Sequence, residues 1–236
     1  MAQNIRRYKG VRPIPENRGY QKMSIDGQFD KWKKIKIEYR DTKGDITHRD
    51  YKGYGGNHYI NNSGRNDIVL SKVAVDKENV YFYVQTANPI TSSTDPNWML
   101  LLIDADNNYS TGWYGYDYLI NQSVVDNTST QIKWYDNTKN EWVKKNVLAY
   151  KAKGNCLELA VSRKDLGLLE DAFVFDFKWA DNPKELKDPI SLCTDGDTAP
   201  NRRFNYRCIW NEYEILLAYI FIDCREYNGF CSVDKS

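Results

Sequence analysis

The amino-acid sequence predicts an all-β fold, an antiparallel β-sandwich with a jelly-roll-like or immunoglobulin-like two-sheet architecture. From Asp67 onward the chain consists of short apolar or alternating runs that are broken by Asn, Asp and Gly, as is typical of strands joined by turns. About ten such runs follow one another at spacings of roughly 8 to 15 residues, without the regular helices that a parallel sheet requires. Aromatic residues, which favour strands, make up 14% of the chain.

The order of segments predicts one domain between a lead-in and a tail. Residues 1–22 are polar, basic and proline-containing, and we expect a linker. Residues 41–66 are rich in Gly, Asn and Tyr without a period, which predicts a long surface loop of the kind that often carries function. We assign residues 23–206 to the sandwich. Residues 207–236 depart from the strand pattern and hold three of the five cysteines, so we treat them as an atypical tail.

The strands are clearest where apolar residues alternate with polar ones. "IVLSKVAVD" and "NVYFYVQTA" are separated only by Lys77 and Glu78, which predicts a hairpin. "CLELAVS" and "FVFDFKWAD" each place every second side chain on one apolar face. Only "SRKDLGLLED" is helix-like, for one or two turns. The other predicted strands are "WMLLLIDAD", "YDYLINQ", "TQIKWYD" and "EWVKKNVLAYKA".

Composition and charge narrow the class of ligand. Lys and Arg (33) nearly cancel Asp and Glu (32), so the chain lacks the basic excess that nucleic-acid phosphates call for. Tyr and Trp are abundant, at 18 and 7 copies, which fits a neutral ligand. The longest apolar run, residues 215–222, is too short for a membrane span. The start lacks the apolar core of a secretory signal, and we interpret the chain as a mature fragment.

The segment "LLLIDADNNYSTGWYGYDYLIN" contains a candidate metal site. A buried strand runs into Asp104, Asp106 and Asn108, and Asp117 lies on the returning strand. Such closely spaced oxygen ligands can converge on Ca²⁺, which takes six to eight of them. The alternative is that these Asp and Asn side chains only cap a tight turn through their own backbone.

Aromatic residues at loop positions are the candidates for sugar binding. Pyranose rings stack on flat apolar faces, while amide and guanidinium groups form paired hydrogen bonds to sugar hydroxyls. The alternative is that these rings belong to the core and that the polar groups are solvated. The candidates for carbohydrate binding are Trp113, Trp179, Trp98, Tyr116, Asn182 and Arg203.

Catalytic motifs give little support to an enzyme. The only histidines are His48 and His58, and the sequence has no nucleophile elbow, glycine-rich phosphate loop or His-Glu-x-x-His motif. No pair of carboxylates stands out for glycoside hydrolysis among the 32 acidic residues. A haem site would need an axial His or Met, and Met99 begins an apolar strand as a core residue would.

Five segments taken in order resemble the family 9 carbohydrate-binding modules and their DOMON-like relatives, over about residues 23–206. They are "SIDGQFDKWKKI", "SKVAVDKENVYFYVQT", "LLLIDADNNYSTGWYGYDYLIN", "LELAVSRKDLGL" and "DGDTAPNRRFNY". The resemblance is strongest to modules attached to secreted glycan-degrading proteins of Bacteroidetes. It implies a sugar site at one end of a β-sandwich and a structural calcium ion. It also implies Asp104 and Asp106 as metal ligands, with Trp113 and Trp179 as stacking residues.

These observations lead to a functional hypothesis with two alternatives. The hypothesis is a non-catalytic carbohydrate-binding module that targets a covalently attached glycoside hydrolase to its glycan, in a secreted, periplasmic or cell-surface protein. The first alternative is a glycan-active hydrolase or lyase domain. The second is a structural spacer in which all the aromatic residues belong to the core.

Overall fold

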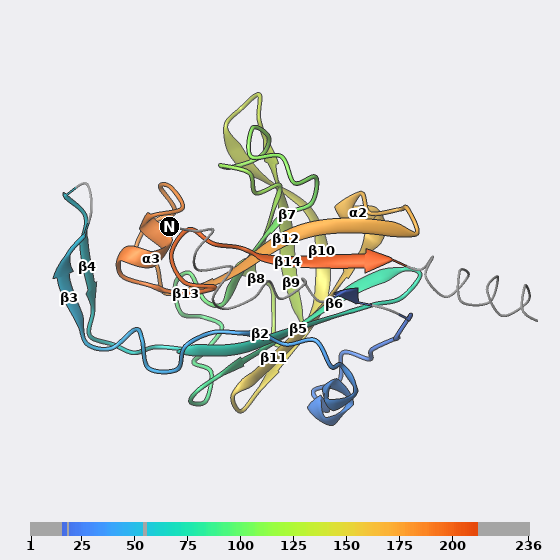
Figure 1. The fold of residues 1–236 in the computed structure, drawn as a ribbon, viewed down its shortest axis with the longest axis horizontal. Coiled ribbons are helices and arrows are strands. Elements are labelled where there is room, and N and C mark those ends of the chain that lie inside the picture. Colours follow the sequence, from blue (N-terminus) through green and yellow to red (C-terminus); the bar gives the residue numbers. More distant parts are fainter. Residues whose placement is uncertain (1–15, 18, 54–55, 212–236) are drawn as a thin grey trace, which may run out of the picture.

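A computed structural model describes residues 16–17, 19–53 and 56–211 of the chain (Figure 1). Most of the predicted lead-in and most of the tail, with Cys224 and Cys231, lie outside the described residues. The elements in chain order are β1 (Glu16–Asn17), η1 (Phe29–Lys34), β2 (Tyr39–Arg40), β3 (Arg49–Lys52), β4 (His58–Asn61), β5 (Ile68–Val75), β6 (Asn79–Thr86), β7 (Leu100–Asp104), β8 (Tyr118–Val124), β9 (Ser129–Asp136), β10 (Glu141–Lys153), β11 (Cys156–Ser162), α2 (Arg163–Leu166), β12 (Ala172–Asp181), α3 (Ser191–Thr194), β13 (Asp197–Ala199) and β14 (Tyr206–Asn211).

The predicted all-β antiparallel architecture is confirmed. Described strands pair in the order β1-β14-β12-β7-β8-β9-β10-β11-β6-β5-β2, with β13 added beside β12. The long strand β10 pairs with β9 over residues 141–149 and with β11 over residues 150–153. It therefore passes from one layer of the sandwich to the other. We call the β1-to-β9 side the larger layer and the β11-to-β2 side the smaller layer.

Alternating apolar residues of both layers fill the space between them. Phe175, Phe177 and Trp179 lie on one face of β12, and all three are fully buried. Phe82 of β6 meets two of these rings from the smaller layer, with ring centroids 5.9 Å and 5.6 Å away. The indole of Trp179 donates to the Ser71 hydroxyl of β5 at 3.0 Å. Aromatic packing of this kind fixes the two layers in register.

A buried carboxylate holds η1 against the outer face of the smaller layer. Glu158 of β11 is 0% exposed, yet its oxygens accept hydrogen bonds from the backbone of Asp26 and Gly27. They also accept from the Lys31 ammonium at 3.0 Å and from the Trp32 indole at 2.7 Å. The "IDG…W" motif of the sequence thus forms a set of donors for one buried anion. Four donors offset the desolvation of a single carboxylate.

The strand and helix predictions differ from the structure in two places. The hairpin of β5 and β6 is confirmed, as is the short helix α2, which ends at Gly167 in the left-handed conformation. Residues 41–66, predicted as a loop, contain the β3–β4 hairpin, in which the aromatic pair Tyr51 and Tyr59 lies directly across the two strands. Strand pairing also continues on both sides of residues 23–206, since β1 pairs with β14 in parallel. Among the described helices, none is long and apolar enough to cross a membrane.

Replacing Glu158 with alanine is expected to lower the free energy of unfolding by about 3 kcal/mol, because the Lys31 ammonium would lose its buried partner. Urea denaturation followed by tryptophan fluorescence measures this change. Asp30→Ala is the matched control on η1, since the Asp30–Lys33 pair is exposed and screened by solvent, and its loss should leave the unfolding midpoint almost unchanged. Equal effects of the two substitutions would contradict the importance of the Glu158 contacts.

Candidate functional site

The loop between β7 and β8 brings carboxylates together. Asp104 ends β7, Asp106 follows two residues later, and Asp117 directly precedes β8. One oxygen from each of them lies within 4.8 Å of the others. Hydrogen bonds inside the loop hold this arrangement. The Ala105 amide donates to Asp117 Oδ2 at 2.8 Å, and the Thr111 hydroxyl donates to Asp106 Oδ2 at 2.9 Å.

The tight return of this loop depends on Gly112. Its φ is +65°, and a Cβ atom there would lie 2.3 Å from the carbonyl oxygen of Tyr116. Only glycine combines this left-handed conformation with so close an approach of backbone to backbone. The return brings Asp117 back beside the end of β7.

Asp104 is the member of this group whose buried side-chain oxygen lacks a hydrogen-bond donor among the described residues. Its side chain is 7% exposed, and Oδ1 accepts no hydrogen bond from a described residue. Burial, together with the charges of Asp117 and Asp176, raises the pKa of Asp104 to about 6. Burial raises the pKa of Asp117 as well. Because a bound cation would offset both burial and mutual repulsion, these carboxylates fit a hard, oxygen-preferring ion such as Ca²⁺.

Asn108, predicted as a further metal ligand, lies on the exposed part of the loop. Its side-chain oxygen accepts from the backbone N–H of Ser110 at 3.1 Å, and the backbone N–H of Asn108 donates to Asp106 Oδ1 at 2.8 Å. These are the turn contacts of the alternative interpretation. These contacts show that Asn108 helps to shape the loop, and its role as a metal ligand stays a prediction.

The predicted stacking rings lie in the interior, which corrects the expectation that loop positions would expose them. Trp98, Trp113, Tyr116 and Trp179 are 1%, 7%, 3% and 0% exposed. Trp98 and Trp179 belong to the core between the layers, whereas Trp113 and Tyr116 pack on the outer face of the larger layer. Rings this deeply buried offer little area to a sugar in this conformation, although Trp98 lines a hollow of about 410 Å³ together with Tyr150.

A pair of stacked tyrosines, one exposed and one half-buried, forms the wall of a different pocket. Tyr51 and Tyr59 are cross-strand neighbours in the β3–β4 hairpin, and their rings stack with centroids 5.3 Å apart at 6°. Gly53 permits this, since a Cβ there would lie 2.2 Å from the Tyr59 ring. Figure 1 shows the hairpin projecting at the end of the sandwich that carries α3. The pocket has a volume of about 460 Å³ and is lined by Tyr51, Gly53, Asn57, Tyr59, Ile190, Cys193, Arg202 and Arg203.

The two arginines sit on a loop that is tied to the core strand β12. The Lys178 ammonium is 0% exposed and donates to the carbonyl oxygens of Pro200 at 2.5 Å and Phe204 at 2.7 Å. These bonds hold both ends of the loop, so Arg202 and Arg203 are presented on its exposed middle. Neither guanidinium forms an ion pair with a described carboxylate. Within the described part of the chain, no carboxylate neutralises these two guanidinium groups.

An acidic cluster lies behind the same loop. The side-chain amide of Asn201 donates to Asp41 Oδ1 at 2.8 Å and to Asp45 Oδ2. Asp41 Oδ2 and Asp45 Oδ1 are buried and accept no hydrogen bond from the described residues. Burial raises the pKa of Asp41 to about 6, and the charge of Asp45 adds to this effect. The cluster holds Asn201, next to the two arginines, against the segment that follows β2.

The hairpin and α3 are joined by polar contacts. Arg49 donates to the carbonyl oxygens of Cys193 at 3.2 Å and of Gly196. Asn61 donates to the carbonyl oxygen of Asp195 at 2.7 Å. Because both contacts use backbone acceptors around α3, the tyrosine wall is held at a set distance from the opposite side of the pocket.

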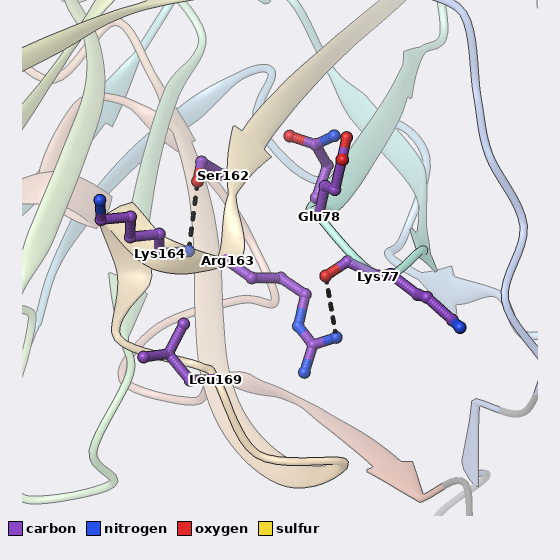
Figure 2. A pocket seen from close by; sticks show the side chains of 7 residues that line it. Lys77, Glu78, Ser162, Arg163, Lys164 and Leu169 are labelled. Carbon is purple, nitrogen blue, oxygen red and sulfur yellow. Dashed lines mark hydrogen bonds between the residues drawn. The ribbon is translucent and has the colours of Figure 1, made fainter.

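Two further hollows carry less binding chemistry. Asn182 lines a polar pocket of about 210 Å³ with Asn61 and Asp195, so the structure does not bring Asn182 and Arg203 into one pocket. A basic pocket at α2 has a volume of about 410 Å³. In Figure 2 the Arg163 guanidinium turns toward the Lys77 carbonyl. The other Arg163 donors also form hydrogen bonds to backbone carbonyls. Arg163 therefore holds neighbouring loops together.

Sequence reasoning thus found one residue of the tyrosine pocket and missed the rest. Arg203 was predicted, whereas Tyr51, Tyr59 and Arg202 were not placed in the site. The sequence does contain a signal, because segment 41–66 is predicted as a long surface loop of the kind that often carries function, and "NRRF" is part of the family resemblance. The pairing of strands that brings Tyr51 beside Tyr59 could not be derived from that aperiodic segment.

Two solved structures of family 9 carbohydrate-binding modules from Caldicellulosiruptor kristjanssonii are similar to this chain. One, in complex with cellotriose, is 11% identical and has a TM-score of 0.38. The alignment covers 93% of this chain and 100% of the solved chain. The other, in complex with glucose, is 13% identical, covers 78% and 85%, and has a TM-score of 0.36. No family model and no curated protein sequence matches the chain. At such low similarity, function has to be argued from the site.

Proposed function

We propose that the chain is a non-catalytic carbohydrate-binding module and that the tyrosine pocket is its sugar site. The observation that carries this proposal is that a stacked tyrosine pair with one exposed ring and two exposed guanidinium groups line one hollow. Sugars are bound by this combination, because rings cover the C–H face of a pyranose while planar donors bond to its hydroxyls. The resemblance of the sequence to family 9 modules supports the same function.

The lining of the pocket supports binding without cleavage. Glycoside hydrolysis uses two carboxyl groups on either side of the scissile bond. The described residues around the tyrosine pocket include no Asp or Glu. In this proposal the module holds an attached glycan-degrading enzyme near its substrate and raises the local concentration of glycan.

Tyr51→Ala is expected to weaken glycan binding by about tenfold, or about 1.4 kcal/mol, because it removes the exposed ring of the pair. Isothermal titration against the glycan that gives the largest thermal shift in a panel measures this loss. The matched control is Tyr109→Ala, since Tyr109 is 85% exposed but lies on the loop after β7. A panel without any binding glycan, or equal binding by wild type and Tyr51→Ala, would contradict the proposal.

We further propose a structural calcium ion at Asp104, Asp106 and Asp117. It would tie the loop after β7 to the start of β8 and so support the outer face of the larger layer. The buried, unpartnered Asp104 oxygen is the observation that supports it. No step of sugar binding depends on this ion, because none of its ligands lines the tyrosine pocket.

Calcium is expected to raise the melting temperature of the wild type relative to chelator, because an ion that binds only the folded state stabilises it. Asp104→Asn should abolish this difference. In chelator the variant should be at least as stable as the wild type, since it removes a buried charge that neighbouring carboxylates repel. Asp126→Asn, in the exposed turn before β9, should keep the full calcium effect. A calcium-dependent shift that survives Asp104→Asn would place the ion elsewhere.

A further inference from the structure

The charges around the tyrosine pocket are unbalanced. Arg202 and Arg203 are exposed in its lining, and no described lining residue is acidic. Arg49 adds a third guanidinium behind Cys193, whose backbone carbonyl accepts one of its hydrogen bonds. The whole chain has a net charge of only +1, so this concentration of positive charge is local to the pocket.

The carboxylates of the neighbouring segments make contacts outside the pocket, and Asp41 and Asp45 accept from Asn201 in the loop that carries the arginines. Asp188 accepts hydrogen bonds from the amides of Ile190 and Ser191 at the start of α3, at 2.8 Å and 2.9 Å. Asp50 of β3 contacts the His58 ring at 2.6 Å. Neither carboxylate lines the pocket. The two guanidinium groups therefore keep their charge and their donors for whatever enters it.

The hydrogen-bonding inventory of the pocket is also one-sided. Every hydroxyl of a neutral sugar donates as well as accepts, so sites for such sugars need carboxylate or amide acceptors besides donors. Here Arg202 and Arg203 supply donors only, and the side-chain acceptors of the lining are the Tyr51 and Tyr59 hydroxyls and the Asn57 amide, none of them charged. An excess of donors calls for a ligand with an excess of acceptors.

We propose that the tyrosine pocket selects anionic glycans, binding a carboxylate or sulfate group of the sugar with Arg202 and Arg203 while the Tyr51–Tyr59 pair covers its ring. This inference rests on the proposed sugar-binding function and specifies its ligand class. The planar fork of arginine matches a carboxylate in two parallel hydrogen bonds, and a charge-assisted bond of this type is about twice as strong as a neutral one. Composition alone indicates a neutral ligand because it averages this local charge over the chain.

The test compares ligands that differ only in charge. Trigalacturonate and triglucuronate are titrated against their methyl esters, and a sulfated carrageenan oligosaccharide is titrated against its desulfated form. We expect at least one acid to bind about tenfold or more tightly than its uncharged counterpart. The carboxylate and sulfate arms show which group is preferred. Raising the salt from about 0.01 M to about 1 M should reduce this preference, because screening shortens the reach of the charges from about 30 Å to about 3 Å.

Substitutions assign the preference to the pocket. Arg203→Gln should weaken binding of the acid much more than binding of the methyl ester, and so remove most of the preference for the acid. The matched control is Lys164→Gln on α2, which changes the net charge equally and should leave the preference intact. Arg203 is exposed, so the variant is expected to melt at the wild-type temperature, and this is checked first.

The outcomes separate this inference from the proposed function. Equal affinity for acids and their uncharged forms, or binding of neutral glycans alone, would overturn the anionic preference and leave sugar binding in place. A preference that persists in Arg203→Gln would also overturn the assignment to this pocket. Failure of every glycan, charged or neutral, would overturn sugar binding itself.

Discussion

Phe175, Phe177 and Trp179 project from one face of β12 into the space between the two layers, and none of them is exposed. Burial of an aromatic side chain of this size contributes on the order of 2 to 3 kcal/mol of transfer free energy. Because β12 pairs with β7 on one side and with β13 and β14 on the other, its position determines where the rest of the larger layer lies. Both candidate sites depend on strands or loops that adjoin it.

The opposite face of β12 connects the core to the tyrosine pocket. Lys178, between two core aromatics in sequence, holds the loop that carries the arginines. Burial lowers the pKa of Lys178 to about 8, while the charges of Cys193, Asp41 and Asp197 favour its ammonium form. The arginine loop is thus fixed before a ligand arrives, and less entropy is lost on binding than for a mobile loop. Lys178 thus connects the buried strand β12 directly to the exposed loop that carries the arginines.

The sequence was most informative where one period governs a whole segment. The alternation in β6, β11 and β12 predicted their strands and their buried faces, because a strand with one core face has to repeat every second residue. The convergence of Asp104, Asp106 and Asp117 also followed from local spacing. The tryptophans were different. Whether a loop folds back over the outside of a sheet, as it does around Trp113, depends on contacts with distant residues such as Trp142. No local pattern contains that information, and the same holds for the tyrosine pair.

The parallel pairing of β1 with β14 has a mechanical consequence. Glu16 lies beside Ile209 and Asn17 beside Trp210, so the first and last described strands run in the same direction next to each other. A pull along the chain from both sides would slide these strands past one another and load their hydrogen bonds together, rather than peel them apart in succession. Tyr20 packs against Trp210 at 5.1 Å between ring centroids and would resist the same displacement. The parallel pair β1–β14 at the edge of the larger layer therefore resists tension along the chain.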